Sequence, residues 1–386
     1  MQAVETLPKI IEREENIAYF CTFDDATRLH GTEMLASGNE FIRMRDEDRA
    51  FLQTHVFRTI RESGGKISFL PVFAGYDYVS KVFHDLQIRR SQWPSLGIMV
   101  PDVVSRGTVE REAENNFSSG QNNTIKPEIA SAIPDLRERI RNGELLQCVL
   151  SQEFPMKEIN VVNTLKRFLK EDRSAYVFYM KFGQFQLLGS SPENLVTMTG
   201  RNLRIKPIAG TRIRGRTPEE DLELGESLLN DEKELLEHRM LVDLARNDLG
   251  KISMPGSVRV TRSMELQKFA TVQHIVSTVE SEREERFTED DVLGAVFPAG
   301  TVSGAPKRRA VELIEKYETS PRGPYAGSVG IAGKGYLDLA LTIRTLYSSG
   351  DGFSVRAGAG IVKDSVVENE AREIVAKARS AAGGAL

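Results

Sequence analysis

Two pairs of glutamates stand at a spacing that could hold a divalent cation. Glu234 and Glu237 lie three residues apart in a stretch of helical character, and Glu370 and Glu373 repeat that spacing near the end of the sequence. Residues three apart share one face of a helix, so each pair presents two carboxylates side by side. Mg²⁺ prefers oxygen ligands of this kind. The spacing alone is a weak signal, because solvent-exposed helix faces produce it routinely and it occurs elsewhere in this chain.

A glycine-rich segment stands directly before the second glutamate pair. Gly358 and Gly360 in RAGAGIV let backbone N–H groups approach a ligand closely, and the N-terminus of the helix that follows favours an anion. Lys377 continues the helical stripe of Glu370 and Glu373. A carboxylate or a phosphate could dock here. The alternative is a tight strand-to-helix turn that simply needs small residues, and the segment by itself leaves both possibilities open.

Polar residues within apolar or glycine-rich segments add ambiguous candidates. Thr301 stands in FPAGTVSGAPK, and Tyr325 stands in RGPYAGSVG. His274 lies in the apolar run FATVQHIVSTV, where a histidine of the core is the simpler interpretation. Arg344, in LALTIRTLY, would demand a carboxylate partner from the protein or a ligand if it is buried. These patterns indicate an acidic site suited to Mg²⁺ near an anion-binding segment.

Local signals predict the elements that carry these residues. The sequence Thr217-Pro218-Glu219-Glu220 combines a capping hydroxyl, proline at the first helical position and glutamate at the third. We therefore expect a helix or helix pair that starts here and ends at Gly250. Residues 1–104 mix short apolar runs with polar helical stretches, residues 105–128 have the composition of a loop or linker, and residues 129–386 alternate strands and helices.

Composition excludes several classes of protein. The 386 residues carry a net charge of −4 with acidic and basic residues interspersed, so no basic stripe is available to neutralise nucleic-acid phosphates. No run approaches the roughly 18 apolar residues of a membrane span, and the first residues lack the apolar segment of a signal peptide. Cys21 and Cys148 lack the spacing of a zinc site. We expect a cytoplasmic protein without nucleic-acid or membrane partners.

Seven segments resemble, in order and spacing, the signature of the chorismate-utilising enzymes, and among them anthranilate synthase component I in particular. The segments are SSPE (191–194), PIAGTRIRG (207–215), DEKELLEHRMLVDLARNDLG (231–250), VQHIVS (272–277), FPAGTVSGAPK (297–307), RGPYAGSVG (322–330) and AGAGIVKDS (357–365). The resemblance is strong over residues 129–386. It implies a single α+β fold of two packed, mostly antiparallel sheets with helices on the outside. Residues 1–104 would be a shortened, divergent part of the same body.

The resemblance also implies how chorismate and a metal would be bound. Glu237 and Glu370 would hold Mg²⁺ beside the ring carboxylate, with Glu234 and Glu373 in direct or water-mediated support. The remaining substrate-binding residues would be Arg344, Tyr325 and the backbone of Gly358, Ala359 and Gly360 for the enolpyruvyl carboxylate, together with Thr301 and Gly210.

Four residues would act in the reaction if the resemblance holds. Glu193 would protonate the departing C4 hydroxyl, which requires burial to raise its pKa. His274 would assist the loss of pyruvate and aromatisation. Lys377 would face the metal and the ring carboxylate, and Thr211 would belong to the same catalytic group.

The favoured function is that of an anthranilate synthase large subunit, a lyase that aminates chorismate at C2 and then eliminates pyruvate for tryptophan biosynthesis. Relatives that add water have lysine where this chain has Gln147, which disfavours isochorismate or salicylate synthesis. Many aminodeoxychorismate synthases, of the folate branch, have a nucleophilic lysine in place of Ala209. That function remains the alternative. A non-catalytic chorismate-binding subunit is disfavoured because none of the expected glutamates has been replaced.

The source of ammonia is a separate expectation. No segment of the chain resembles the nucleophile elbow of a glutaminase. We therefore expect a heteromeric complex in which a separate glutamine amidotransferase subunit supplies ammonia.

Overall fold

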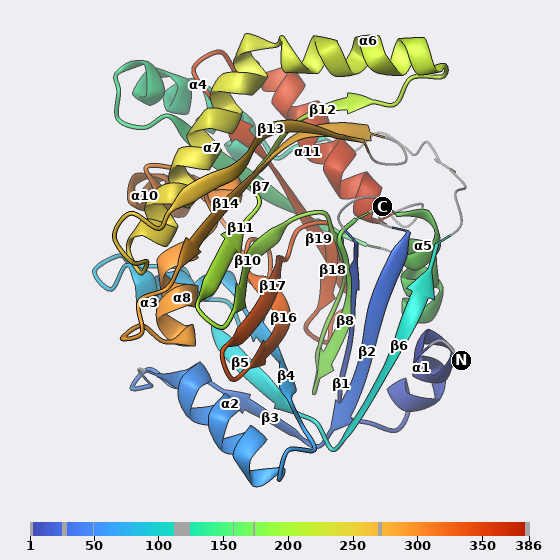
Figure 1. Cartoon of the computed structure of the whole chain (residues 1–386). Coiled ribbons are helices and arrows are strands. Elements are labelled where there is room, and N and C mark those ends of the chain that lie inside the picture. The colour runs from blue at the N-terminus through green and yellow to red at the C-terminus, as the bar shows by residue number, and fades with distance from the viewer. Residues whose placement is uncertain are drawn as a thin grey trace.

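Two large antiparallel sheets form the body of the chain (Figure 1). The structure is a computed structural model that describes residues 3–24, 29–48, 50–111, 124–156, 158–172, 174–268 and 272–382. The first sheet has the order β15 (Gly304–Ala305), β7 (Gln147–Pro155), β19 (Phe353–Ile361), β18 (Thr345–Ser348), β9 (Phe185–Ser191), β8 (Tyr176–Phe182), β1 (Asn16–Phe23), β2 (His30–Gly38) and β6 (Val103–Glu110).

The second sheet contains strands from the same parts of the chain as the first. Its order is β12 (Ile208–Ile213), β14 (Val272–Glu282), β11 (Asn202–Ile205), β10 (Asn194–Thr199), β17 (Tyr336–Leu341), β16 (Ser328–Gly333), β4 (Phe69–Ala74), β5 (Leu96–Val100) and β3 (Glu40–Arg43), and β13 (Arg259–Lys268) also pairs with β14. The α+β fold of two mostly antiparallel sheets expected from the resemblance is confirmed. The first hundred residues contribute strands to both sheets.

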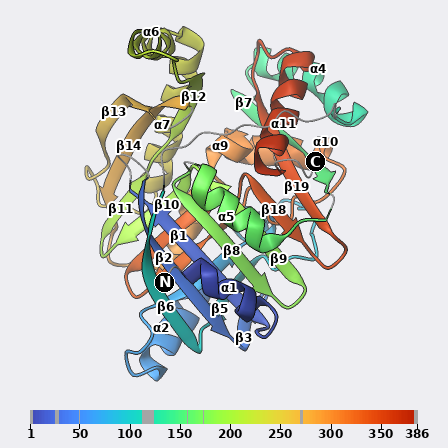
Figure 2. The same ribbon diagram turned by 90° about the vertical axis from the view of Figure 1, so that its right-hand side faces the viewer.

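Helices cover the outside of the sheets and the rim of the cavity described below. They are α1 (Ala3–Ile11), α2 (Phe51–Glu62), the 3₁₀ helix η1 (Tyr76–Tyr78), α3 (Val79–Val82), α4 (Pro127–Arg141), α5 (Val161–Glu171), α6 (Pro218–Leu229), α7 (Glu232–Gly250), α8 (Glu289–Val296), α9 (Gly300–Ser303), α10 (Lys307–Tyr317) and α11 (Val367–Ala382). Figures 1 and 2 show α7 and α11 on opposite sides of the same end of the molecule.

An aromatic core joins the inner faces of the two sheets. Trp93 packs against Phe73 of the second sheet and Phe182 of the first, with ring centroids 5.6 and 5.8 Å apart. On β8, Phe178 belongs to this core, whereas its neighbour Tyr179 faces the other way, toward α1 and α5. Side chains that alternate across a strand therefore bury both faces of the first sheet.

The predicted loop over residues 105–128 is wrong for its first part. Residues 103–110 form β6, which pairs with β2 at the edge of the first sheet. The polar composition that suggested a loop suits an edge strand, because an edge strand has one neighbour and exposes much of its surface. Helix α4 begins at Pro127, and residues 112–123 lie outside the described residues.

The predicted helix pair is confirmed. Thr217 accepts a hydrogen bond from the backbone N–H of Glu220, and Pro218 is the first residue of α6. The pair breaks before Asp231, whose carboxylate caps α7 by accepting from two backbone N–H groups, including that of Glu234. Helix α7 ends at Gly250. This cap fixes the helical phase that turns the first glutamate pair toward the cavity.

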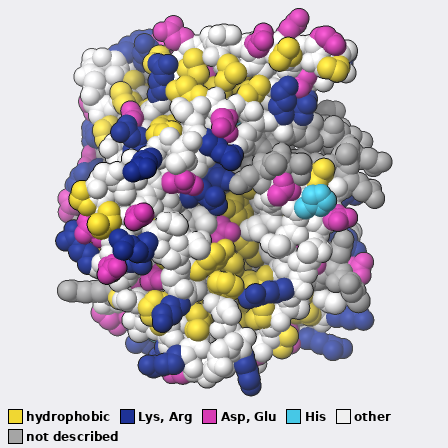
Figure 3. Space-filling model, in the orientation of Figure 1, with side chains coloured by type: hydrophobic (Ala, Val, Ile, Leu, Met, Phe, Trp, Pro, Cys, Tyr) yellow, Lys and Arg dark blue, Asp and Glu magenta, His cyan; other side chains and the backbone are white. Residues whose placement is uncertain are grey.

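The distribution of charge on the surface is relevant to nucleic-acid partners, and the character of the helices is relevant to membranes. Acidic and basic side chains are interspersed on the face in Figure 3, without a large patch of one sign. Within the described ranges, no helix combines the length and the apolar character that crossing a bilayer requires.

Candidate active site

A cavity of about 500 Å³ brings the predicted site residues together between α7 and α11. Strands β7, β12, β14 and β19 supply much of its wall. Fourteen of the fifteen predicted residues line it: Glu193, Gly210, Thr211, Glu234, Glu237, His274, Thr301, Tyr325, Arg344, Gly358, Gly360, Glu370, Glu373 and Lys377. The two glutamate-bearing helices, far apart in the sequence, thus face one space.

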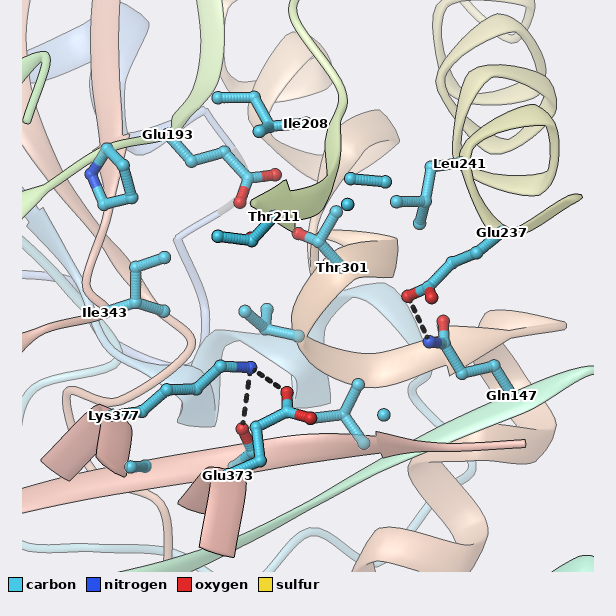
Figure 4. Close-up of a pocket in the computed structure, with 18 of the residues that line it drawn as sticks. Gln147, Glu193, Ile208, Thr211, Glu237, Leu241, Thr301, Ile343, Glu373 and Lys377 are labelled. Carbon is cyan, nitrogen blue, oxygen red and sulfur yellow. Dashed lines mark hydrogen bonds and ion pairs between the residues drawn. The ribbon is translucent and has the colours of Figure 1, made fainter. Parts of the chain in front are cut away.

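The first glutamate pair projects into the cavity from α7. Glu237 accepts a hydrogen bond from Gln147 Nε2 at 3.0 Å (Figure 4). Glu234 lies 3.6 Å from the guanidinium of Arg212. Burial raises the pKa of Glu234, and the charge of Glu237 raises it further. Burial also raises the pKa of Glu237, with the charge of Glu373 across the cavity adding to the effect and the Gln147 hydrogen bond opposing it.

The second glutamate pair belongs to the first two turns of α11. Burial and then the charge of Glu373 raise the pKa of Glu370, partly offset by a hydrogen bond from Ser365. Glu373 accepts from Lys377 Nζ at 2.6 Å. Lys377 Nζ also donates to the carbonyl oxygen of Gly358 at 3.3 Å, which joins the helix to β19.

This set of donors fits Mg²⁺ in its chemistry. All four glutamates offer oxygen atoms, which the ion prefers. Burial raises the pKa values of three of them, Glu234, Glu237 and Glu370, and repulsion from a neighbouring carboxylate adds to each shift. A cation would relieve that repulsion. Within the described residues, however, no three acidic, histidine or cysteine side chains stand close enough together to form a ready-made metal site.

Glu193 stands apart from the other carboxyl groups in its electrostatics. It is buried, and desolvation raises its pKa to about 7, although the nearby Thr301 hydroxyl and the charge of Lys377 oppose the shift. Its carboxyl group points into the cavity toward Thr301 in Figure 4. Thr301 Oγ1 is buried and makes no hydrogen bond of normal geometry within the described residues. A carboxyl group with this pKa is available as a proton donor near neutral pH.

His274 is held in one tautomer by the strand opposite. Its Nδ1 lies 2.8 Å from the carbonyl oxygen of Gly210 and 3.2 Å from Thr211 Oγ1. Because a carbonyl oxygen only accepts, Nδ1 carries the proton, and the basic nitrogen of the neutral ring is Nε2. Gly210 has φ of +67°, and a Cβ there would lie 2.8 Å from Leu228 Cδ1, so this bend in β12 requires glycine.

The glycines of RAGAGIV lie within strand β19, so they do not form the tight strand-to-helix turn that was one of the two possibilities for this segment. Residues 354–361 of β19 pair with β7, and α11 begins only at Val367. The other neighbour, β18, pairs with residues 353–355 alone. Among the described strand pairs, β19 therefore has one open edge next to the cavity.

Backbone groups of Gly358 face that open edge. Its carbonyl oxygen accepts from Lys377, and the N–H and C=O of one residue in an antiparallel strand point to the same side. The strand also needs glycine for close packing. A Cβ at Gly358 would lie 2.7 Å from Tyr325 Oη, and one at Gly360 would lie 2.4 Å from Gln147 Nε2.

Ala359 is the predicted site residue that the structure places elsewhere. Alternation along β19 turns its methyl group into the main hydrophobic core, where it is 0% exposed. Its backbone faces the partner strand β7, opposite Leu150. Ala359 therefore does not line the cavity, because every second residue of a strand points away from any one face.

Arg344 and Tyr325 line the same cavity from segments outside the two glutamate-bearing helices. Within the described residues, Arg344 has no carboxylate partner within salt-bridge distance, although it is half-buried and lines the cavity. Its φ is +49°, and Ala326, next to Tyr325, has φ of +63°. Non-glycine residues in this region are strained, and such strain concentrates at ligand sites. An unpaired guanidinium beside a buried tyrosine hydroxyl suits a carboxylate ligand.

Several residues of the site were missed at the sequence level. Lys233 and Arg356 line the cavity, and a buried ion cluster of Glu318 and Arg322 with Arg356 lies behind the wall. Arg322 belongs to RGPYAGSVG and Arg356 is the first residue of RAGAGIV, and these places in the two motifs were the available signals. Nothing in the local pattern around Glu318 distinguishes it from a surface charge.

Comparisons with known proteins agree with this geometry. A family described as chorismate binding enzyme matches residues 73–383. Anthranilate synthase component 1 of Aquifex aeolicus is 48% identical over 272 residues, 70% of this chain and 55% of the relative. The protein of the same name from Methanothermobacter marburgensis is 43% identical over 292 residues, 74% of this chain and 61% of the relative. The matches thus span little more than half of these curated relatives.

Solved structures share the fold over nearly the whole chain. Anthranilate synthase component I from Streptococcus pneumoniae superposes with a TM-score of 0.74 at 31% identity, covering 96% of this chain and 92% of that one. A putative isochorismate synthase from Bacillus anthracis, at 22% identity and a TM-score of 0.75, shares the fold. With the family match spanning most of the sequence, the chain belongs to the chorismate-binding enzyme family.

Proposed function

We propose that this chain is the chorismate-converting component of an anthranilate synthase. It would aminate chorismate at C2 with ammonia in a Mg²⁺-dependent reaction and then eliminate pyruvate to give anthranilate. The observation that carries the proposal is Glu193, a carboxyl group with a pKa of about 7 in the same cavity as the paired glutamates and the unpaired Arg344. The names of the similar proteins from Aquifex aeolicus and Streptococcus pneumoniae support the same activity.

The two walls of the cavity suit the two carboxylates of chorismate. Arg344, Tyr325 and the Gly358 N–H would bind the enolpyruvyl carboxylate, which gives a planar guanidinium a two-point contact. Glu237 and Glu370, supported by Glu234 and Glu373, would hold Mg²⁺ near the ring carboxylate. When bound, the ion supplies the positive charge that lets this carboxylate lie among four glutamates.

The chain's own residues account for the proton movements. Glu193, protonated near neutral pH, would give its proton to the C4 hydroxyl, which leaves as water while the nitrogen of ammonia bonds to C2. His274, with Nδ1 bound to Gly210, would assist removal of the C2 proton through Nε2 as the enolpyruvyl group leaves as pyruvate. Chorismate and ammonia are thereby converted into anthranilate, pyruvate and water, and all atoms are accounted for.

Two neutral side chains favour ammonia as the nucleophile. Gln147 lines the cavity where relatives that add water have lysine, and its amide is engaged by Glu237. Ala209, which also lines the cavity, presents a methyl group where many aminodeoxychorismate synthases have a nucleophilic lysine. We further propose that ammonia comes from a separate glutamine amidotransferase subunit. Glutamine-dependent activity of the purified chain alone would contradict that part.

Product identification tests the function directly. Purified protein is incubated with chorismate, Mg²⁺ and ammonium at alkaline pH, and the product is identified by fluorescence and mass. Anthranilate with an equal amount of pyruvate is expected. Formation of 4-amino-4-deoxychorismate without pyruvate would assign the chain to the folate branch, and isochorismate would show that water is the nucleophile.

A further inference from the structure

A buried ion cluster backs one wall of the cavity, and one of its members, Arg356, reaches the cavity lining. We propose that Glu318, Arg322 and Arg356 form a positioning unit that holds the Thr301 segment and Tyr325 in register with β19. The inference rests on the proposed function, because it assigns these residues a part in chorismate binding and turnover. None of the three is placed at the reacting atoms, so each acts through the residues it holds.

Glu318 is the centre of the cluster. Its carboxylate accepts from Arg322 Nη2 at 2.6 Å and Nε at 3.0 Å, and from Arg356 Nη1 at 2.8 Å. The backbone N–H and the hydroxyl of Ser151, on β7, donate to the same carboxylate at 2.8 and 2.9 Å. The charged side chains are 1–3% exposed. Two guanidinium groups against one carboxylate leave a net charge of +1 behind the wall that faces an anionic substrate.

Arg322 connects the cluster to three parts of the cavity wall. Its Nη1 donates to the carbonyl oxygen of Val302, the residue after Thr301, at 2.7 Å. Its Nη2 donates to the carbonyl oxygen of Val149 on β7, also at 2.7 Å. The guanidinium carbon lies 5.5 Å from the centre of the Tyr325 ring. One planar group thus sets the relative positions of α9, β7 and the tyrosine.

Arg356 connects the cluster to the strand that carries Gly358. It precedes Gly358 by two residues on β19 and therefore lies on the same face of the strand. Its Nη1 also donates to Ser151 Oγ at 3.2 Å, and its Nη2 donates to Ser320 Oγ. The segment 318–320, which leads to Arg322, is thereby tied to the open-edged strand.

Stability alone is a weak reason for such a cluster. Buried ion pairs lose much of their Coulomb attraction to the desolvation of the charges, and apolar residues of similar volume often serve the fold as well. Rigid support of ligand-binding groups is the role that this geometry suits, since outer-shell contacts lock the side chains that touch the ligand.

Arg322→Lys is the variant that separates positioning from charge. Lysine keeps the positive charge but cannot bond to Glu318 and two carbonyl oxygens in a planar fork. Arg111→Lys is the matched control, because Arg111 is equally buried and donates to three backbone carbonyls, those of Leu169, Ser174 and Phe168, without lining the cavity.

The first measurement needs no substrate. Tyrosine-labelled protein is examined by NMR, with the Tyr325 signal assigned from Tyr325→Phe. The Tyr325 signal is expected to shift in Arg322→Lys and to stay in place in Arg111→Lys. An unchanged Tyr325 signal in a folded Arg322→Lys protein would overturn the positioning role.

The second measurement is a double-mutant cycle on turnover with chorismate and ammonium. Arg322→Lys is expected to lower kcat about 10- to 100-fold, the usual range for lost outer-shell support, whereas Arg111→Lys changes stability without changing the activity of the folded fraction. Thr301→Val should cost about tenfold less in the Arg322→Lys background than in the wild type, because the hydroxyl is already displaced. Additive losses would contradict the proposal.

The outcomes distinguish the two proposals. A wild-type protein that does not turn over chorismate defeats the proposed function, while a shifted Tyr325 signal still supports positioning. Turnover with additive losses and a fixed Tyr325 signal defeats positioning alone. If Arg322→Lys does not fold, Ser151→Ala takes its place, because it removes one hydroxyl of the cluster. Coupling to Thr301→Val is again expected, at a smaller size.

Discussion

The cavity has a helix side, which carries the glutamates, and a strand side, formed by β19 and the loops that hold Tyr325 and Arg344. The two sides differ in how completely the protein prepares them. On the strand side, Arg344, Tyr325 and Gly358 stand on strained or tightly packed backbone, backed by the buried Glu318 cluster. On the helix side, Glu234, Glu237, Glu370 and Glu373 repel one another and are stabilised by single contacts such as that of Gln147. The strand side is thus organised in advance, and we infer that the helix side is completed only when a cation binds.

Removing a carboxylate from the helix side should have the largest effect. We expect Glu370→Gln to lower kcat by about a thousandfold or more, because it removes one of the two main Mg²⁺ ligands of the proposal and several kcal/mol of metal-dependent stabilisation. Steady-state rates over a range of Mg²⁺ concentrations measure this. Glu368→Gln, exposed on the same helix, is the control and should act as wild type. Retained Mg²⁺-dependent activity in Glu370→Gln would refute the ligand assignment.

Replacing Glu193, the proposed acid, should give the next largest effect. Glu193→Gln is expected to lower kcat by about a hundredfold, since the amide cannot donate the proton to the leaving hydroxyl. In the wild type, the pKa of about 7 predicts a descending limb in the plot of kcat/KM against pH. The carboxyl group is protonated below that pH, so kcat/KM should fall about tenfold per pH unit above it.

The pH experiment requires a constant concentration of free ammonia, because ammonia itself gains a proton as the pH falls. The descending limb should be absent in Glu193→Gln. A limb that persists unchanged in this variant would assign the titration to another group.

A conservative change on the strand side should have the smallest effect. Arg344→Lys keeps the positive charge but replaces a two-point contact with one, so KM for chorismate should rise about tenfold with a smaller change in kcat. Steady-state kinetics separate the two constants. Arg246→Lys, exposed on α7 and paired with Asp243, should leave both unchanged. An unaltered KM in Arg344→Lys would remove this residue from the substrate site.

The sequence predicted the helix side of the cavity better than the strand side. The capping signal at Thr217 and the three-residue spacing of Glu234 and Glu237 are local features of the sequence. They can therefore be recognised without knowledge of the fold. The open edge of β19 is not local, because it depends on where β18 stops pairing. For the same reason the sequence left Gly358 open between a ligand-binding segment and a tight turn, and Ala359 was placed in a site that it faces away from.

The buried cluster shows a second limit of prediction from sequence. Glu318 and Arg322 are only four residues apart, but they meet Arg356 and Ser151 through the pairing of β19 with β7, which brings distant parts of the sequence together. Charged residues are common on surfaces, so their burial cannot be inferred from local composition. The family resemblance supplied residues that line the cavity and omitted the buried charges behind them.

The coupling between Mg²⁺ and chorismate tests the contrast between the walls most directly. Chorismate binding is titrated without ammonium, in the presence and absence of Mg²⁺, in wild type and Glu370→Gln. We predict that Mg²⁺ tightens chorismate binding about tenfold in the wild type, a typical coupling between two ligands, and has no effect on binding in Glu370→Gln. Equal affinity of the wild type for chorismate with and without Mg²⁺ would contradict the account.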